Sequence, residues 1–333
     1  MLHGSRLVNR LRYALSRYAV ALRSVVSRSL YLVRTGAPRG VFFAYYAGML
    51  DGGALRKEYR TQLENFDAAK RDLQVSNDWF SAHAPRWLAM MDAHGLRRTD
   101  VKALEIGSWE GLSSFFILSE LPRAHLTCVD TWEGGDEHKD GTASSVAALS
   151  QVEFAFDANL SPFASRLTKF KGTSYAFFND HDLHDHFDFI YVDGSHRSDD
   201  VIIDAVKSFE ALKVGGVMIV DDYFWDYYPR ATDNPAAAIN LFLRLKKGAY
   251  EIIQVQDQLA VHKTAGSAGP LRASTGTEGT PGFESGIQPF HRLFLRWVSS
   301  CPAFRRGTGA GGAGHRLAGG MHRQNIFALS LLC

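Results

Sequence analysis

Short apolar runs alternate with helix-like segments through the middle of the chain. The runs that predict strands are residues 101–106, 124–129, 166–171, 187–192, 216–220, 249–255 and 258–263. Helical patterns precede or separate them at about 54–96, 112–121, 144–160, 173–180, 198–212 and 234–247. Strands that alternate with helices are typical of a parallel sheet with helices on both faces. We therefore predict an α/β fold with a doubly wound, mostly parallel sheet of seven strands.

The last two apolar runs are too close together for a parallel connection. Only Gln256 and Asp257 lie between them. A crossover between parallel strands needs a dozen or more residues, whereas an antiparallel pair needs only a tight turn. The sheet is therefore predicted to end in a C-terminal hairpin that contains one antiparallel strand.

The first predicted strand ends in an acid and leads into a turn bounded by glycines. Glu105 ends the strand, the turn runs from Gly107 to Gly111, and Asp130 ends the second strand. Glycines let a ligand approach the backbone, and an acid at the tip of the second strand accepts hydrogen bonds from a ribose diol. This layout predicts a nucleoside-binding unit. The alternative is an ordinary strand-turn-helix with an acid there by chance.

The residue in the middle of this turn bears on the kind of nucleoside. A dinucleotide fingerprint has a glycine there, so that the pyrophosphate can contact the backbone. This chain has Trp109 instead. S-adenosylmethionine carries no phosphate, and its amino-acid end requires room and polar partners. The turn therefore favours S-adenosylmethionine over NAD.

Charge and glycine content divide the chain into three parts. Residues 1–50 contain eight arginines and no acid, and residues 265–333 contain seven arginines and two glutamates. Of the 37 basic and 35 acidic residues in the chain, 22 basic and 33 acidic ones remain for residues 51–264. An acidic body argues against a nucleic-acid partner, because phosphate binding requires a basic surface.

We place the domain boundaries after residues 53 and 264. Residues 1–53 form a basic amphipathic extension, residues 54–264 form the domain with an N-terminal helical cap, and residues 265–333 form a tail. The tail holds 13 of the 30 glycines, and we expect it to be disordered because it cannot bury enough apolar area.

Arginines recur among apolar residues in the segment 5–34. Three interpretations stay open: a helix that packs on the body or a partner, a helix on a membrane surface, or a transit-type leader. No run of 18 uncharged apolar residues is present, so no spanning helix is predicted. Three scattered cysteines favour a reducing compartment. We expect a cytoplasmic protein, with peripheral membrane contact if residues 5–34 bind a surface.

Five segments, in this order, resemble class I S-adenosylmethionine-dependent methyltransferases. They are LEIGSWEG (104–111), VDTWEGGDEH (129–138), FDFIYVDGSHRSDDV (187–201), LKVGGVMIVDDY (212–223) and QLAVHKT (258–264). Within this class the chain is similar to the methyltransferase domain 24 group, with its cephalosporin hydroxylase-like and macrocin O-methyltransferase-like proteins. The resemblance covers about residues 75–264 and implies a Rossmann-like sheet.

The resemblance also implies a set of cofactor-binding residues. They are Glu105, Gly107, Ser108, Gly111, Asp130, Trp132, Thr173 and Ser174. Glu105 and the glycine turn would border the methionine end of the cofactor, Asp130 would bind the ribose hydroxyls, and Thr173 would contact the adenine edge. Trp109 departs from the glycine pattern of many class members.

Three aspartates follow the fourth and fifth predicted strands. Asp193 ends one strand, and Asp221 with Asp222 ends the next. Adjacent parallel strands place these tips side by side, where carboxylates repel unless they are protonated or bridged by a cation. Oxygen ligands suit Mg²⁺, and the spacing resembles the metal triad of catechol-type and macrocin-type O-methyltransferases. The alternative is that Asp221 or Asp222 caps the following loop.

His196, three residues beyond Asp193, is the candidate general base. An imidazole can take a hydroxyl proton at neutral pH, and Asp193 would face the acceptor beside it. The alternative is a capping or cofactor-side histidine. Five aromatic residues between 223 and 228 could form a wall for a ring or a sugar, or could pack on the N-terminal helices.

Together these patterns predict a methyltransferase that methylates a hydroxyl of a small molecule or a glycan. Its cofactor would be S-adenosylmethionine, with assistance from Mg²⁺. Two alternatives stay open: a different activity of the cephalosporin hydroxylase-like group, and a non-catalytic subunit that binds the cofactor. Neither the acceptor nor the oligomeric state can be read from the sequence.

Overall fold

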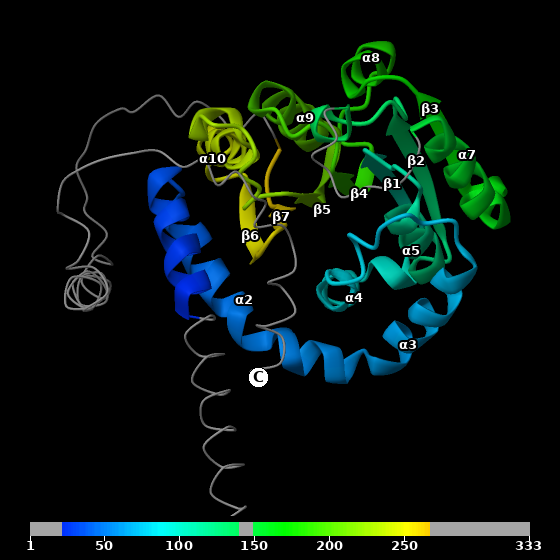
Figure 1. Cartoon of the computed structure of the whole chain (residues 1–333), viewed down its shortest axis with the longest axis horizontal. Coiled ribbons are helices and arrows are strands. Elements are labelled where there is room, and N and C mark those ends of the chain that lie inside the picture. Colours follow the sequence, from blue (N-terminus) through cyan, green and yellow to red (C-terminus); the bar gives the residue numbers. More distant parts are fainter. Residues whose placement is uncertain (1–21, 140–148, 267–333) are drawn as a thin grey trace, which may run out of the picture. The chain divides into compact units, whose positions relative to one another are not determined.

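The computed structural model describes residues 22–139 and 149–266. Its seven strands form one sheet in the order β3-β2-β1-β4-β5-β7-β6 (Figure 1). The strands are β1 (Val101–Ile106), β2 (Ala124–Asp130), β3 (Leu167–Lys171), β4 (Phe187–Val192), β5 (Leu212–Val220), β6 (Tyr250–Val255) and β7 (Leu259–Lys263). Strands β1 to β5 pair in parallel, whereas β7 is antiparallel to both β5 and β6. The predicted fold class, with its antiparallel C-terminal hairpin, is confirmed.

Helices cover both faces of this sheet, which is why the central strands are mostly apolar on both faces. They are α2 (Arg39–Glu58), α3 (Arg60–Ala69), α4 (Ala84–Ala93), α5 (Leu112–Glu120), α6 (Asp136–Lys139), α7 (Leu149–Leu160), α8 (Ser174–Asp180), α9 (Ser198–Ala211) and α10 (Pro235–Leu245). Figure 1 shows α8, α9 and α10 on one side of the sheet and α4 and α5 on the other. The first part of the predicted helix 144–160, residues 144–148, lies outside the described residues.

The core consists of two buried clusters, one on each face of the sheet. Neighbouring strand residues alternate between them, as the two-residue repeat of a strand requires. Ala103 and Phe189 belong to the cluster that contains Trp87 of α4. Leu104 and Ile190 belong to the other cluster, together with side chains of α9 and α10.

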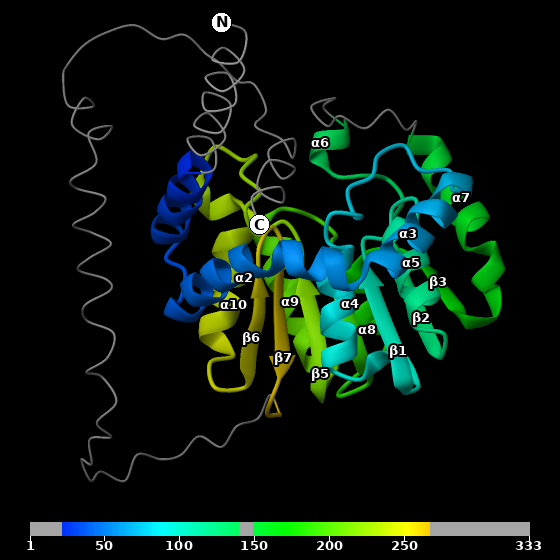
Figure 2. The ribbon, with the colours of Figure 1, turned by 90° about the horizontal axis from the view of Figure 1, so that it is seen from below.

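The described part of the N-terminal extension packs against this domain. Residues 22–34 are helical, and α2 packs against β6 and lies across the direction of the strands (Figure 2). Leu32, Val41 and Tyr45 are buried in the second cluster. The boundary placed after residue 53 falls inside α2, which continues to Glu58. Of the three interpretations of segment 5–34, packing on the body is therefore the one that fits residues 22–34. Residues 5–21 and the predicted tail from residue 267 onward lie outside the described range.

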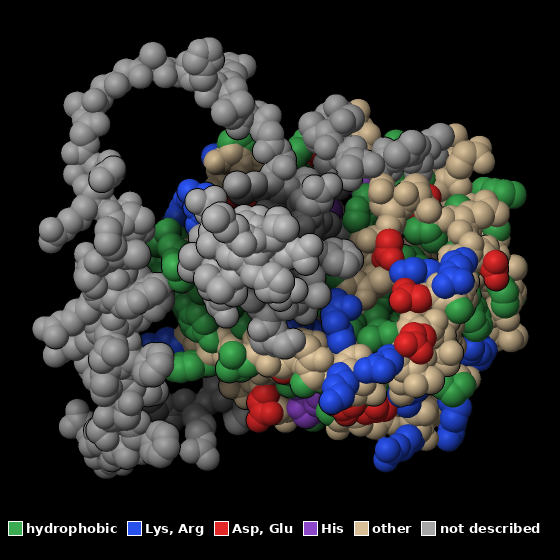
Figure 3. Space-filling view, turned by 60° about the horizontal axis from the view of Figure 1, so that its bottom comes forward, with side chains coloured by type: hydrophobic (Ala, Val, Ile, Leu, Met, Phe, Trp, Pro, Cys, Tyr) green, Lys and Arg blue, Asp and Glu red, His purple; other side chains and the backbone are tan. Residues whose placement is uncertain are grey.

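The helices and the surface of the described residues bear on membrane and nucleic-acid partners. Within residues 22–139 and 149–266, no helix is both long and apolar enough to cross a bilayer. On the face drawn in Figure 3, basic and acidic side chains are interspersed. This face lacks the continuous basic surface, among its described residues, that phosphate binding requires.

Candidate active site

The turn after β1 lies directly against the end of β4. Gly107 has a φ of +83°, and a Cβ placed on it would lie 1.9 Å from the carbonyl oxygen of Asp193. The Asp193 N–H in turn donates to the Ile106 carbonyl at 2.7 Å. Only glycine combines this conformation with so close a backbone contact. The glycine at the start of the turn therefore fixes how β1 and β4 meet at the ligand edge.

Asp130, at the end of β2, holds the neighbouring turns in place. One carboxylate oxygen accepts the N–H groups of Ser108 and Trp109, both at 2.8 Å, and the other accepts the Trp132 N–H at 2.7 Å. Trp109 and Trp132 have φ values of +48° and +56°, which non-glycine residues rarely adopt. A carboxylate accepts about four hydrogen bonds, so Asp130 retains capacity for about one more.

Glu105 supports the same turn from inside the domain. Its carboxylate is fully buried and accepts hydrogen bonds from the hydroxyls of Ser113, at 2.6 Å, and Ser114. Burial raises the pKa of Glu105, while these hydroxyl donors oppose the shift. Glu105 is not among the residues that line the adjacent cavity, so its contact with a cofactor stays a prediction.

A small cavity of about 50 Å³ opens beside the turn. Gly107, Ser108 and Asp193 line it from the sheet, and Asn77 and Trp79 line it from the segment before α4. The sequence patterns did not assign a role to that segment, although its aromatic cluster WFSAHAPRW was a visible signal.

Trp79 and Trp109 line this cavity, and the His138 ring packs against both of them. The ring centroids of Trp109 and His138 are 4.4 Å apart, and those of Trp79 and Trp109 are 6.1 Å apart. The Trp109 Nε1 atom is buried and has no hydrogen-bond partner among the described residues. Ligand sites usually measure 300–1,000 Å³, so a nucleoside needs the three rings to separate.

Three other predicted cofactor residues have clear structural contacts. Thr173 caps α8 by accepting the Ala176 N–H at 3.1 Å. Ser174 hydrogen-bonds to the buried Asp204. Gly111 starts α5 with a φ of +83°, and a Cβ there would lie 3.1 Å from the Phe156 ring. These contacts explain the residue types, and the cofactor contacts stay predictions.

A second group of side chains meets at the carboxyl ends of β4 and β5. Ligand atoms of Asp193, His196 and Asp222 all lie within 4.8 Å of one another. The His196 Nε2 atom is 2.8 Å from Asp222 Oδ2 and 4.0 Å from Asp193 Oδ1. Two carboxylates and an imidazole form a donor set that can hold a divalent cation.

Asp221 does not join this group, although the sequence assigned it to the metal site with Asp193 and Asp222. Its carboxylate accepts hydrogen bonds from the Tyr191 hydroxyl at 2.5 Å and from Gln258 Nε2 at 2.9 Å. In this structure His196 occupies the third position of the group instead.

A chain of buried hydrogen bonds fixes Asp221 from behind. Trp87 Nε1 donates to Gln258 Oε1 at 2.7 Å, and Gln258 donates to Asp221. The Tyr191 hydroxyl contacts both Asp221 and, at 2.8 Å, Asp193. A phenol has one proton to donate, so contact with both acids requires that one of them be protonated.

The same acids perturb each other electrostatically. Burial and the charge of Asp221 raise the pKa of Asp193 to about 8, while the hydrogen bond from His196 opposes the shift. Asp193 therefore retains its proton to a higher pH than an isolated aspartate, first because it is buried and second because Asp221 carries the same charge.

The predicted aromatic wall divides into two parts. Tyr223 and Phe224 turn inward: the Tyr223 hydroxyl donates to Asn240 at 2.7 Å, and the Phe224 ring packs on Tyr45. The Trp225 ring instead lies 4.6 Å from the His196 ring. Phe224 therefore follows the prediction of packing on the N-terminal helices. Trp225 follows the prediction of a wall beside the acidic group.

Comparisons with known proteins agree with the fold. A family model described as a methyltransferase domain matches residues 104–223. This range includes the β1 turn and the Asp193 group. The resemblance to class I S-adenosylmethionine-dependent methyltransferases is confirmed to this extent: residues 104–223 match the model of a methyltransferase domain. No curated protein matches the sequence.

Several solved structures share the fold at low sequence identity. The O-methyltransferase TomG from Streptomyces achromogenes, in complex with SAM, is 16% identical to this chain. The alignment covers 61% of this chain and 89% of TomG, with a TM-score of 0.42. The SAH-bound methyltransferase PaMTH1 from Podospora anserina is 12% identical over 61% and 87% of the chains, with a TM-score of 0.40. MycE from the mycinamycin pathway, in complex with Mg, SAH and mycinamycin VI, is 17% identical over 69% and 57%, with a TM-score of 0.40.

Proposed function

We propose that this chain is an S-adenosylmethionine-dependent O-methyltransferase that uses a divalent cation, preferably Mg²⁺. The acceptor would be a hydroxyl of a small molecule or a glycan. The observation that carries the proposal is the group Asp193, His196 and Asp222, which lies beside the Gly107 turn of a methyltransferase domain.

The residues around the turn suit the proposed cofactor. When bound, S-adenosylmethionine supplies a methyl carbon that its sulfonium makes electrophilic. Gly107 lines the adjacent cavity, Asp130 has capacity for a ribose hydroxyl, and the buried Trp109 Nε1 is a free donor for a carboxylate. Trp79 and His138 would move aside to admit the nucleoside.

The residues of the second group would bind and deprotonate the acceptor. Asp193 and Asp222 would hold the cation, which would lower the pKa of an acceptor hydroxyl near it. His196 Nε2 points at both carboxylates, so it can serve as a third ligand or as the base that accepts the proton. Trp225, which lies against His196, would orient a ring or a sugar.

Methyl transfer itself asks the protein mainly to align the reacting atoms and to exclude water. The buried chain from Trp87 to Asp221 supports this role, because it fixes Tyr191 and hence the Asp193 carboxylate. A cytoplasmic location and peripheral membrane contact through residues 5–34 remain parts of the proposal that rest on the sequence.

Transfer of a labelled methyl group from S-adenosylmethionine to a panel of phenols and glycosides tests the proposal. We expect turnover that EDTA abolishes and added Mg²⁺ restores. Asp222→Asn should remove it, whereas Asp233→Asn, on an exposed ion pair with Arg230, should not. Cofactor binding without turnover on any acceptor would favour the non-catalytic subunit instead.

His196→Gln separates the two roles of the imidazole. If His196 is the base, the variant should keep Mg²⁺ affinity and lose turnover, with partial recovery at high pH. If His196 is a metal ligand, higher Mg²⁺ concentration should restore turnover. Full activity of the variant at neutral pH and low Mg²⁺ would exclude both roles.

A further inference from the structure

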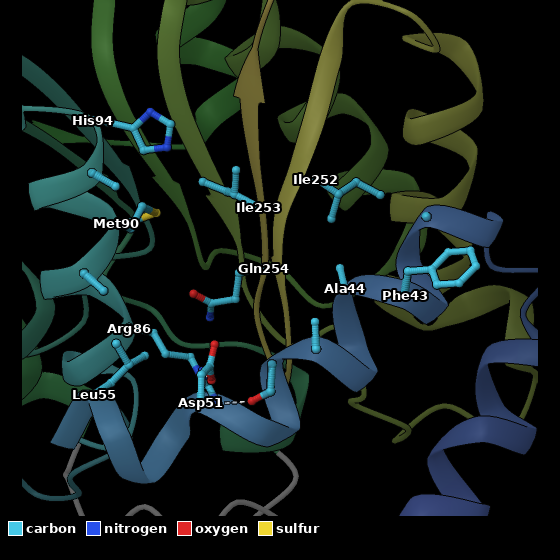
Figure 4. A pocket seen from close by; sticks show the side chains of 15 residues that line it. Phe43, Ala44, Asp51, Leu55, Arg86, Met90, His94, Ile252, Ile253 and Gln254 are labelled. Atoms are coloured by element: carbon cyan, nitrogen blue, oxygen red, sulfur yellow. Dashed lines mark hydrogen bonds and ion pairs between the residues drawn. The ribbon is translucent and has the colours of Figure 1, made fainter. Parts of the chain in front are cut away.

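A second cavity lies at the other end of the sheet, between α2, α4 and β6. Its volume is about 550 Å³, and none of its lining residues lines the cavity beside the Gly107 turn. Figure 4 shows side chains from the three elements around a common space. This volume falls in the range of small-molecule sites.

Small residues on the two helices create this space. Helix α2 lines it with Gly40, Ala44 and Gly48, which follow one another at four-residue intervals, and α4 lines it with Ala89 and Ala93. Residues four apart share one face of a helix. Protein interiors are close-packed and leave few voids larger than a water molecule. The cavity is therefore a consequence of these sequence positions.

An irregularity in β6 completes the third wall. Ile252, Ile253 and Gln254 all line the cavity although they are consecutive. The pairing of β6 with β7 shifts register between Ile252 and Gln254. In a regular strand, successive side chains point to opposite faces, and a bulge re-aims one of them.

One polar group inside this apolar lining lacks a partner. The Gln254 Nε2 atom is buried, and the described residues offer it no hydrogen bond; Figure 4 shows its side chain between the two helices. A buried donor without an acceptor is costly. By contrast, Arg86 at the end of the cavity is satisfied by the Asp51 carboxylate and by the Gly48 carbonyl at 2.6 Å.

The cavity is also elongated. Its lining on α4 extends from Arg86 to His94, which is about 12 Å at the helical rise of 1.5 Å per residue. Most of its other large side chains, among them Leu55, Met90 and Ile252, are aliphatic, and Phe43 and His94 add two rings to the lining. An elongated, mostly apolar space with one unpaired amide donor favours an uncharged, chain-like ligand over a charged one.

We propose that this cavity binds a single-chain aliphatic molecule whose uncharged hydroxyl or carbonyl oxygen accepts a hydrogen bond from Gln254. An uncharged head fits because the one cation at the cavity, Arg86, among its described lining residues, is already paired with Asp51. A carboxylate would have to leave water without a matching charge. The site is independent of the methyl-transfer site and of the function proposed for it.

Fluorescence of N-phenyl-1-naphthylamine, an uncharged apolar probe, tests this site on the full chain. We expect emission to rise on binding and 1-decanol to displace the probe. Decanoate should displace it at least about tenfold less well, because its charge would be desolvated. No emission increase, or equal displacement by both compounds, would overturn the proposal.

Cavity-filling variants locate the binding. The double variant Ala44→Leu/Ala89→Leu should weaken probe binding at least about tenfold, because it removes the space. Ala54→Leu, at an exposed position of α2 outside the lining, is the matched control and should bind normally. Gln254→Leu should retain the probe and weaken displacement by 1-decanol. Thermal melting confirms that each variant is folded.

Two results would refute this location. One is equal probe binding by the double variant and the Ala54→Leu control. The other combines two findings: the unmodified chain sediments as a dimer and does not bind the probe, whereas the double variant sediments as a monomer. The latter outcome would assign the small-residue faces to an interface between two copies.

Discussion

Replacing Gly107 with alanine is expected to destabilise the domain by about 2–5 kcal/mol. An L-residue at the φ of +83° costs roughly 1–2 kcal/mol. The new Cβ would also lie 1.9 Å from the Asp193 carbonyl oxygen and 2.8 Å from Gly194 Cα. These are backbone atoms at the end of β4 and cannot rotate away, so overpacking adds about 1–3 kcal/mol or more.

Urea unfolding followed by circular dichroism measures this difference. The matched control is Gly95→Ala, because Gly95 has a φ of +70° and no atom within 4 Å of a built Cβ. The control should lose only the conformational part, roughly 1–2 kcal/mol. If both variants lose the same stability, the close contact between the β1 turn and β4 is wrong, and with it the account of why this turn needs glycine.

The remaining predictions concern pH, cofactor binding and turnover. Burial raises the pKa of Asp204 to about 7. Its contribution to the free energy of unfolding is therefore full below about pH 4 and is lost as the pH rises through 7. Between pH 5 and pH 8, the free energy of urea unfolding should fall less for Asp204→Asn than for the unmodified chain. Asp130→Ala should weaken S-adenosylmethionine binding in calorimetry by roughly 1–3 kcal/mol through lost hydrogen bonds, and unchanged affinity would contradict its ribose role. Asp221→Asn should spare cofactor binding and reduce turnover, because Tyr191 loses its second carboxylate; equal loss of both would refute this division.

The sheet could be predicted because its strands are buried on both faces. The predicted bounds of β1 and β4 agree with the structure, since each is a mostly apolar run, interrupted by Lys102 and Glu105 in β1 and by Asp188 in β4. Strand β5 begins at Leu212, four residues before the predicted start. Its first residues contain Gly215 and Gly216 and read as a turn, but Leu212 pairs with Phe187 across an irregular register. The start of β5 is therefore set by its pairing with β4, which the local sequence pattern does not reveal.

The N-terminal boundary failed for a similar reason. Gly52 and Gly53, next to the change from a basic to an acidic composition, indicate a linker. Helix α2 nevertheless runs through them, because Val41 and Tyr45 bury their side chains against the domain. Intrinsic helix preferences are small beside such burial. The positions of Gly40, Ala44 and Gly48 on one face were visible in the sequence, but their packing beside β6 was not.

The positions of the three aspartates at the acidic site could be predicted from the sequence, but the directions of their side chains could not. Placing Asp193, Asp221 and Asp222 at one edge of the sheet followed from topology alone. Topology alone does not show where the two side chains point, because Asp221 and Asp222 follow the end of β5 and Asp222 leaves the extended conformation. Asp221 turns toward Tyr191, and Asp222, with a φ of +56°, turns toward His196.

This division has an electrostatic consequence for the proposed cation. Asp221 remains close enough to raise the pKa of Asp193, although Tyr191 and Gln258 hold it in place. A proton and a divalent cation relieve the same repulsion between carboxylates. Asp221 would therefore strengthen cation binding at Asp193 and Asp222 as a fixed charge behind them, without being a ligand itself.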